Sequence, residues 1–174
     1  MLAWSTAFTA ETAQPVFKAQ VAAGLVIVAP ADWKPQLIKA GAALVLRSPL
    51  ENGAADEFSL AARERARAAV SVVAQRLAAG TDRSVFVQRC IADLERLGTG
   101  LVIEERSLLR LGGSDFERLR YRFEIGPYRF VQIQHIAVVE GEGLCVVCGC
   151  GAEYFARWSR DFAALGAELR PVER

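Results

Sequence analysis

The residues of this chain best suited to metal, redox or nucleophilic chemistry are four cysteines and one histidine. Cys145, Cys148 and Cys150 lie within six residues, in a stretch that predicts one β-strand. Side chains alternate along a strand, so Cys148 and Cys150 should share one face while Cys145 points to the other. A tetrahedral zinc site would need Cys90 or His135 from another element as a further ligand. Because cysteine packs well in cores, the pattern favours buried thiols, with a redox or metal site on this strand as the alternative.

His135 is the only histidine, so it is the one candidate for imidazole catalysis. A catalytic triad needs a nucleophile on one side of the histidine and an acid on the other. The chain has no Gly-x-Ser-x-Gly element, and the glycines of Leu111-Gly112-Gly113 lack the spacing of a phosphate-binding loop. A histidine in the middle of a strand is more often a hydrogen-bonded sheet residue. We therefore expect no enzymatic activity, no cofactor and no bound metal.

Arg118, Arg120 and Arg122 form a row on one face of a predicted strand. Such a row could bind an anion or an acidic partner. It could equally be a solvated sheet face on which arginines pair with glutamates of a neighbouring strand. Glu104 and Glu105, on the preceding predicted strand, are suitably placed for this second interpretation.

Two further sets of residues are candidates for binding. Trp4 lies in a weakly patterned N-terminal stretch, where a large aromatic side chain could anchor a protein partner. Gln132, Gln134 and His135 could supply the polar groups of an otherwise apolar pocket between the sheet and a helix.

Hydrophobic periodicity predicts the elements that position these residues. Helices are expected over 81–97, where Thr81 or Asp82 can cap the first turn, and over 152–169. A helix or loop is expected over 59–67, a polar loop over 51–57, and an extended arm or short helix over 1–20. The expected strands are 24–30, 42–49, a segment from 67 to 77, 101–111, 116–125, 129–140 and 144–150. The last four are separated by glycine turns, which predicts a β-meander.

Composition indicates one domain over residues 1–174, with 51–68 as an insert or loop. The 21 Lys and Arg against 20 Asp and Glu give a formal charge of +1, which favours neither nucleic acid nor an anionic membrane. The N-terminus lacks the pattern of a signal peptide, and the apolar run at 21–30 is too short to span a bilayer. We expect a cytoplasmic protein, or a periplasmic protein or lipoprotein if an upstream leader was removed.

Short motifs follow one another in a recognisable order. A helix precedes a strand that ends in Leu111-Gly112-Gly113, and the next strand carries Tyr121 at its middle before a glycine turn. Gln134-His135 follows on another strand. Upstream, Pro30-Ala-Asp-Trp33 precedes a strand that ends at Ser48-Pro49. The last helix has an aromatic face made of Phe155, Trp158 and Phe162.

This order resembles the superfamily of PsbP, the DcrB-like bacterial proteins, the LpqN-type lipoproteins and the Mog-type Ran-binding protein. The resemblance covers most of the chain after residue 24. It implies an α+β fold, a PsbP-like sandwich with a central antiparallel sheet of about six or seven strands flanked by helices. It transfers no catalytic residues. The Ala/Arg-rich stretch at 51–68 departs from the pattern, and residues 1–20 have no counterpart.

Members of this superfamily serve as accessory subunits, lipoproteins, GTPase binders and, in one branch, chaperones for type VI secretion effectors. The predominance of arginine over lysine and the many alanines suggest a bacterial source. The resemblance implies a protein-interaction adaptor or secretion-effector chaperone that binds a protein partner without catalysis. If an amphipathic helix binds on the sheet, the sheet should expose an apolar patch. A carrier of a small apolar ligand and a thiol redox or metal-binding protein are the alternatives. The oligomeric state is left open, a homodimer included.

Overall fold

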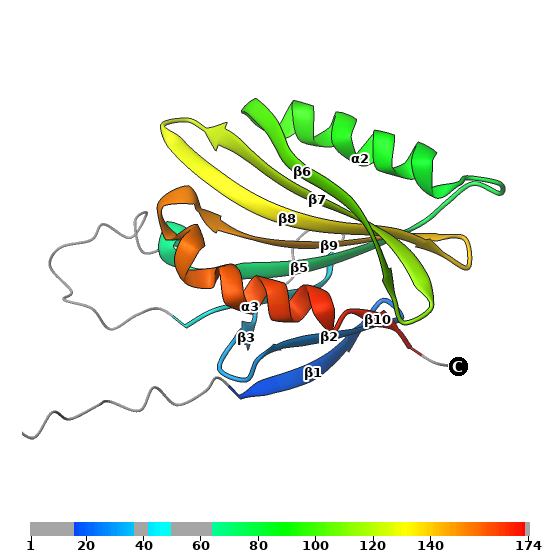
Figure 1. Cartoon of the computed structure of the whole chain (residues 1–174), viewed down its shortest axis with the longest axis horizontal. Helices are drawn as coiled ribbons and strands as arrows, with labels where there is room; N and C mark the ends of the chain where they lie inside the picture. The colour runs from blue at the N-terminus through cyan, green and yellow to red at the C-terminus, as the bar shows by residue number, and fades with distance from the viewer. Residues whose placement is uncertain (1–15, 37–41, 50–63, 173–174) are drawn as a thin grey trace, which may run out of the picture.

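The computed structural model describes residues 16–36, 42–49 and 64–172, and its centre is a seven-stranded antiparallel sheet (Figure 1). The strand order is β3-β4-β5-β9-β8-β7-β6. The strands are β3 (Lys34–Pro35), β4 (Ala42–Arg47), β5 (Ala69–Arg76), β6 (Thr99–Leu111), β7 (Ser114–Ile125), β8 (Tyr128–Val139) and β9 (Glu142–Gly151). The α+β fold with six or seven antiparallel strands is confirmed.

Strands β6 to β9 form the predicted meander, in which each strand pairs with the next one along the chain. Glycines in the left-handed region make its turns, with φ of +79° at Gly113 and +78° at Gly141. A side chain at either position would be strained. Strand β9 then pairs with β5, which precedes the meander, so that Val73 lies opposite Cys145.

A second sheet has three described strands, β1 (Phe17–Ala22), β2 (Leu25–Pro30) and β10 (Arg170–Pro171). The prediction of an arm or short helix over 1–20 is wrong for residues 17–20, which belong to β1, while 1–15 lie outside the described residues. Most side chains of β1 are exposed or half-buried, so the strand carries little hydrophobic alternation. The sequence feature that could have identified the β1–β2 hairpin is Ala23-Gly24, which forms a two-residue turn with positive φ at both residues.

Two helices pack on opposite faces of the seven-stranded sheet (Figure 1). Helix α2 (Arg83–Leu97) begins after Asp82, whose carboxylate accepts a hydrogen bond from the Val85 backbone N–H at 2.9 Å. This bond satisfies one of the N–H groups that every helix leaves unpaired at its start. The last predicted helix is a short 3-10 turn, η1 (Ala152–Tyr154), followed by α3 (Phe155–Ala167), which lies beside β2.

Strand β5 confirms the strand that was predicted after residue 67. Residues 64–66 are helical, and β5 begins at Ala69. The expected loop over 51–57 lies outside the described residues, and so does the 59–63 part of the predicted helix or loop over 59–67. Within the part of the chain that the structure describes, no helix is long and apolar enough to cross a membrane.

A separate cluster of buried side chains occupies each face of the large sheet. On the α3 side, Phe116 and Phe162 are at most 1% exposed, and on the α2 side Phe86 and Tyr121 are at most 2% exposed. Burying one such side chain stabilises the fold by about 1.5–3 kcal/mol. The two clusters are separated by the sheet, so the position of a residue along its strand decides which face its side chain joins.

Candidate functional site

A groove of about 440 Å³ lies between helix α2 and the adjoining face of the large sheet. We call it the α2 groove. One wall is formed by α2, with Phe86, Cys90, Asp93 and Leu94. The floor is formed by side chains of β5, β9, β8 and β7. Its volume is in the usual range for small-ligand pockets, about 300–1,000 Å³.

Strand register explains why the floor residues meet. Side chains of one face recur every second residue, so Gln132 and Gln134 of β8 point to the same side. Tyr121 of β7 lies opposite Gln132, and Val147 of β9 lies opposite Gln134. Together with Val73 of β5, these side chains form a floor that crosses four strands beneath α2.

The centre of the floor is polar and uncharged. The Tyr121 hydroxyl donates a hydrogen bond to Gln132 Oε1 at 2.7 Å and lies 3.5 Å from Gln134 Oε1. Burial raises the pKa of Tyr121 well above its ordinary value, so the phenol stays protonated and remains a donor. Val73 and Val147 lie half-buried beside these groups. The floor therefore has neutral hydrogen-bonding groups, of which Gln132 is half-buried and Tyr121 and Gln134 are buried, and the α2 wall adds one charged residue, Asp93.

Glycine at position 149 makes room for one of these polar groups. A Cβ on Gly149 would stand 2.4 Å from Gln132 Cγ, which is far inside contact distance. Gly149 is paired with Gln132 across β8 and β9. Because residue 149 has no side chain, the Gln132 side chain can lie over β9. In this position the Gln132 Oε1 atom accepts the hydrogen bond from Tyr121.

Two thiols line the same groove. Cys90 Sγ of α2 and Cys145 Sγ of β9 are 3.6 Å apart, at hydrogen-bonding distance for sulfur. The hydrogen bond between the two thiols lowers the pKa of Cys90, while the same pairing and burial raise the pKa of Cys145. The sequence predicted Cys90 on the apolar stripe of the 81–97 helix and, as an alternative to His135, as a further metal ligand, but it did not predict the contact with Cys145. The place of Cys90 on that stripe was the signal that it faces the sheet.

The other two cysteines belong to the opposite face, as the alternation predicted. Cys148 and Cys150 are 0% and 5% exposed in the α3-side cluster, whereas Cys145 belongs to the α2-side cluster. All four thiols are free and buried. Among the residues that the structure describes, no group of three or more His, Cys, Asp or Glu side chains is arranged to hold a metal ion.

His135 does not join Gln132 and Gln134 in the groove. It lies one residue out of step with them on β8, so its side chain points to the α3 face, where it is 1% exposed. Burial, and secondarily the charge of Arg118, lowers its pKa to about 4. Its Nδ1 atom has no hydrogen-bond partner, contrary to the expectation for a mid-strand histidine. His135 is thus a neutral packing residue under α3.

The arginines pair with glutamates of the neighbouring strand, as the second interpretation predicted, but only Arg122 of the row is exposed. Arg118 pairs with Glu105, and Arg120 pairs with Glu104 at 3.2 Å. Arg122 Nε lies 3.7 Å from Glu104, and its side chain is 59% exposed. The row is on the face of β7 opposite Tyr121, away from the α2 groove. Arg120 and Arg122 share Glu104, so the two glutamates neutralise most but not all of the positive charge of the three arginines.

Two further predictions concerned Trp4 and an exposed apolar patch on the sheet. Trp4 lies outside the described residues. The sheet does expose apolar side chains, both the half-buried valines of the α2 groove and a set on strand β6, at one edge of the sheet. The exposed apolar residues of β6 are Val102, Ile103 and Leu108.

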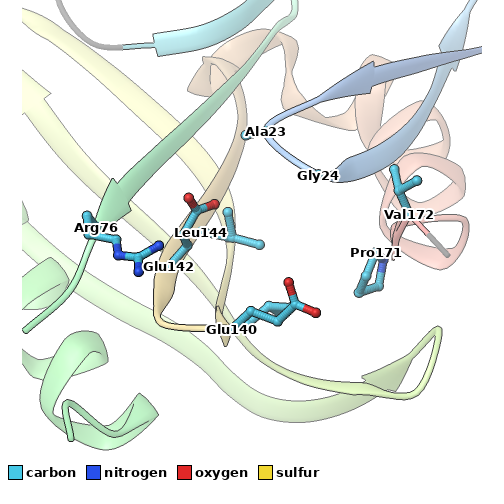
Figure 2. A pocket seen from close by; sticks show the side chains of 9 residues that line it. Ala23, Gly24, Arg76, Glu140, Glu142, Leu144, Pro171 and Val172 are labelled. Carbon is cyan, nitrogen blue, oxygen red and sulfur yellow. The ribbon is translucent and has the colours of Figure 1, made fainter. Parts of the chain in front are cut away.

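A smaller hollow of about 190 Å³ lies where the β1–β2 turn meets the β8–β9 turn and β10 (Figure 2). Arg76, Glu140 and Glu142 line it together with apolar residues. Figure 2 shows Arg76 reaching toward Glu142 across the end of the sheet. Two carboxylates and one guanidinium meet in this hollow, which has less than half the volume of the α2 groove, and we regard the larger α2 groove as the candidate site.

Comparisons with known proteins bear on the fold. No protein-family model and no curated protein matches the chain. The solution structure of the cyanobacterial PsbP (CyanoP) from Synechocystis sp. PCC 6803 matches with a TM-score of 0.60 and 11% identity, over 92% of this chain and 95% of that one. LpqN, involved in cell envelope biogenesis of Mycobacterium tuberculosis, matches with a TM-score of 0.62 and 12% identity, over 86% and 83%.

The Saccharomyces cerevisiae Ran-binding protein Mog1p also matches, with a TM-score of 0.59 and 11% identity, over 92% of this chain and 97% of that one. Identities this low show likeness of fold alone. The matches extend over nearly the whole of each chain, as the order of motifs predicted. This protein therefore has the PsbP-like α+β sandwich fold.

Proposed function

We propose that this protein is a non-enzymatic binding protein, an adaptor or effector chaperone, that receives a segment of a protein partner in the α2 groove. The single observation that supports the proposal is the neutral polar row of Tyr121, Gln132 and Gln134 on the floor of a groove whose other lining residues are mostly apolar. A side-chain amide offers one carbonyl acceptor and an N–H₂ donor, the same groups that a peptide backbone offers. A neutral, partly apolar peptide segment complements such a surface.

A partner of this class is consistent with the fold. One of the similar structures is that of a Ran-binding protein, Mog1p. Proteins that bind amphipathic segments commonly do so in a groove with apolar anchoring positions. Here Leu94 of α2 and the valines of β5 and β9 would contact apolar side chains, and the glutamines would fix the register of the segment.

The arrangement of potential catalytic groups supports a non-enzymatic role. The only histidine of the chain lies on the opposite face of the sheet from the groove thiols. Activation of a cysteine nucleophile commonly needs an imidazole within hydrogen-bond reach. Cys90 instead has a second thiol as its neighbour.

Affinity capture from the host organism tests the proposal, with three baits read by quantitative mass spectrometry. Wild type is compared with Val147→Arg, which places a charge on the groove floor, and with Val85→Arg on the exposed side of α2. Val85 is 51% exposed and does not line the groove. We expect one stoichiometric partner with wild type and Val85→Arg and at least a tenfold loss with Val147→Arg. Equal capture by all three folded baits would show that the groove is not the site.

A carrier of a small apolar ligand is the second candidate, favoured by the volume of the groove and the convergence of its polar groups. Native mass spectrometry of protein purified from its host distinguishes the two. A co-purifying small molecule that is absent from Val147→Arg would favour the carrier. Protein without such a molecule would leave the peptide-binding role as the better explanation of the groove.

A further inference from the structure

The thiols of Cys90 and Cys145 are 55 residues apart in the sequence and 3.6 Å apart in space. They come from different elements, α2 and β9, and both line the α2 groove. A disulfide has an S–S distance of about 2.05 Å, so the two sulfurs must approach by about 1.5 Å to form a covalent bond. The two sulfurs are thus arranged for a bond that would join the helix to the sheet.

Cys90 differs from the other three cysteines in chemistry, because its pKa alone is lowered. The hydrogen bond with Cys145 has the largest effect on the pKa of Cys90 and lowers it, while burial and the charge of Asp93 act against it and the nearby Arg89 acts with it. On the other face, burial raises the pKa of Cys148 and Cys150 to about 12. Because the thiolate is the reactive form, oxidation should begin at Cys90.

We propose that Cys90 and Cys145 form a peroxide-sensitive dithiol site whose disulfide fastens α2 to β9 at the α2 groove. The Cys90 thiolate attacks one peroxide oxygen, an S–O bond forms as the O–O bond breaks, and the hydroxide released takes a proton to become water. Cys145 then attacks the Cys90 sulfenic sulfur. The S–S bond forms, the S–O bond breaks, and the leaving hydroxide takes the Cys145 proton. Two thiols are oxidised, and one hydrogen peroxide is reduced to two waters.

The disulfide has a consequence for the groove, and this consequence rests on the proposed function. Cys90 lies in the α2 wall and Cys145 in the floor. A covalent bond between them prevents α2 from moving away from β9. A partner segment that needs the groove to widen would bind the reduced protein and be excluded from the oxidised one.

The test treats reduced, folded protein with a small excess of hydrogen peroxide and maps the products by non-reducing peptide mass spectrometry. We expect the loss of two hydrogen atoms from the intact protein and a linked peptide pair that contains Cys90 and Cys145. The melting temperature should rise by several degrees and return after dithiothreitol. Cys90→Ser and Cys145→Ser should each abolish the linked peptide and the reversible shift.

Cys150→Ser is the matched control, because it changes a buried thiol of the same strand on the other face. It should keep the linked peptide. If it does not fold, the peptide map of wild type alone still decides the question. Oxygen addition at Cys90 without a link to Cys145, a link that involves Cys148 or Cys150, or four thiols unchanged by peroxide would each overturn the dithiol site.

The regulatory consequence is measured separately by repeating the capture experiment with reduced and oxidised wild type, and with peroxide-treated Cys145→Ser. Loss of the partner only from oxidised wild type supports control of the groove by the disulfide. Equal capture in both states overturns that control and leaves the disulfide in place. Absence of any partner in either state counts against the proposed function instead.

Discussion

The α carbon of Gly166 in helix α3 packs directly on the imidazole of His135 in strand β8. A Cβ at position 166 would stand 2.9 Å from His135 Nε2 and 3.0 Å from Cε1. His135 is held between the sheet and the helix with 1% exposure, so the ring has little freedom to move aside. The close approach of α3 to the sheet thus depends on a glycine at this point.

This contact predicts opposite effects of one substitution in two backgrounds. Gly166→Ala should destabilise the wild-type protein by about 1 kcal/mol or more, because overpacking costs more than alanine gains in a helix. In a His135→Ala background the clash is gone, and the same change should stabilise by about 0.5–1 kcal/mol. Denaturant unfolding of the four proteins measures both. An identical effect of Gly166→Ala in the two backgrounds would contradict the contact.

Burial of neutral His135 predicts a loss of stability in mild acid. The pKa is about 4 in the folded protein against an ordinary value of 6.5, so the unfolded chain binds the proton more readily. Stability is therefore full above about pH 6.5 and declines as the pH falls toward about 4. The expected loss from this group between about pH 7 and pH 5 is about 2 kcal/mol.

His135→Gln isolates the histidine from the other titrating groups. The difference in unfolding free energy between wild type and His135→Gln should shrink by about 2 kcal/mol over that range. The two proteins are compared in matched buffers by urea unfolding. Parallel pH profiles would mean that His135 is already protonable in the folded state.

Removal of the Tyr121 hydroxyl should weaken the polar floor of the α2 groove. Tyr121→Phe leaves the Gln132 carbonyl without its donor, which is expected to cost about 1 kcal/mol of stability. Tyr128→Phe is the control, since Tyr128 is 39% exposed and should change stability by less than about 0.5 kcal/mol. If the groove binds a partner through this row, only Tyr121→Phe should weaken capture.

Gly149→Ala tests the same row without changing any of its polar groups. The added methyl would collide with Gln132 Cγ, so Gln132 must turn away from Tyr121 or β9 must shift. We expect a loss of about 1–3 kcal/mol in unfolding free energy, measured by urea titration. In the Gln132→Ala background the loss should be smaller. An equal loss in both backgrounds would place the strain elsewhere, such as at the Val131 carbonyl.

The arginine row should matter little for stability. Arg122 is 59% exposed and its contact with Glu104 is 3.7 Å, so Arg122→Ala should change the unfolding free energy by less than about 0.5 kcal/mol. Because the row lies on the opposite face of β7 from Tyr121, partner capture should also be unaffected. A strong loss of capture with folded Arg122→Ala would indicate an acidic partner on this face instead.

Much of the fold followed from local patterns in the sequence. Alternation over 116–125 identified β7 and placed Tyr121 and the arginines on opposite faces. The same two-residue period correctly separated Cys145 from Cys148 and Cys150. These predictions succeeded because the side-chain period of a strand is a property of neighbouring residues and needs no knowledge of distant ones.

What only the tertiary structure decided is the meeting of elements far apart in the chain. The pairing of β5 with β9 brings Val73 beside Cys145, and the packing of α2 brings Cys90 there from 55 residues away. No local pattern specifies that approach, because it depends on how well the faces of whole elements pack together. Strand β1 was missed for the related reason that its stability comes from pairing with β2 rather than from its own hydrophobic pattern. Sequence thus determined which side chains share a face, and packing determined which faces form the groove.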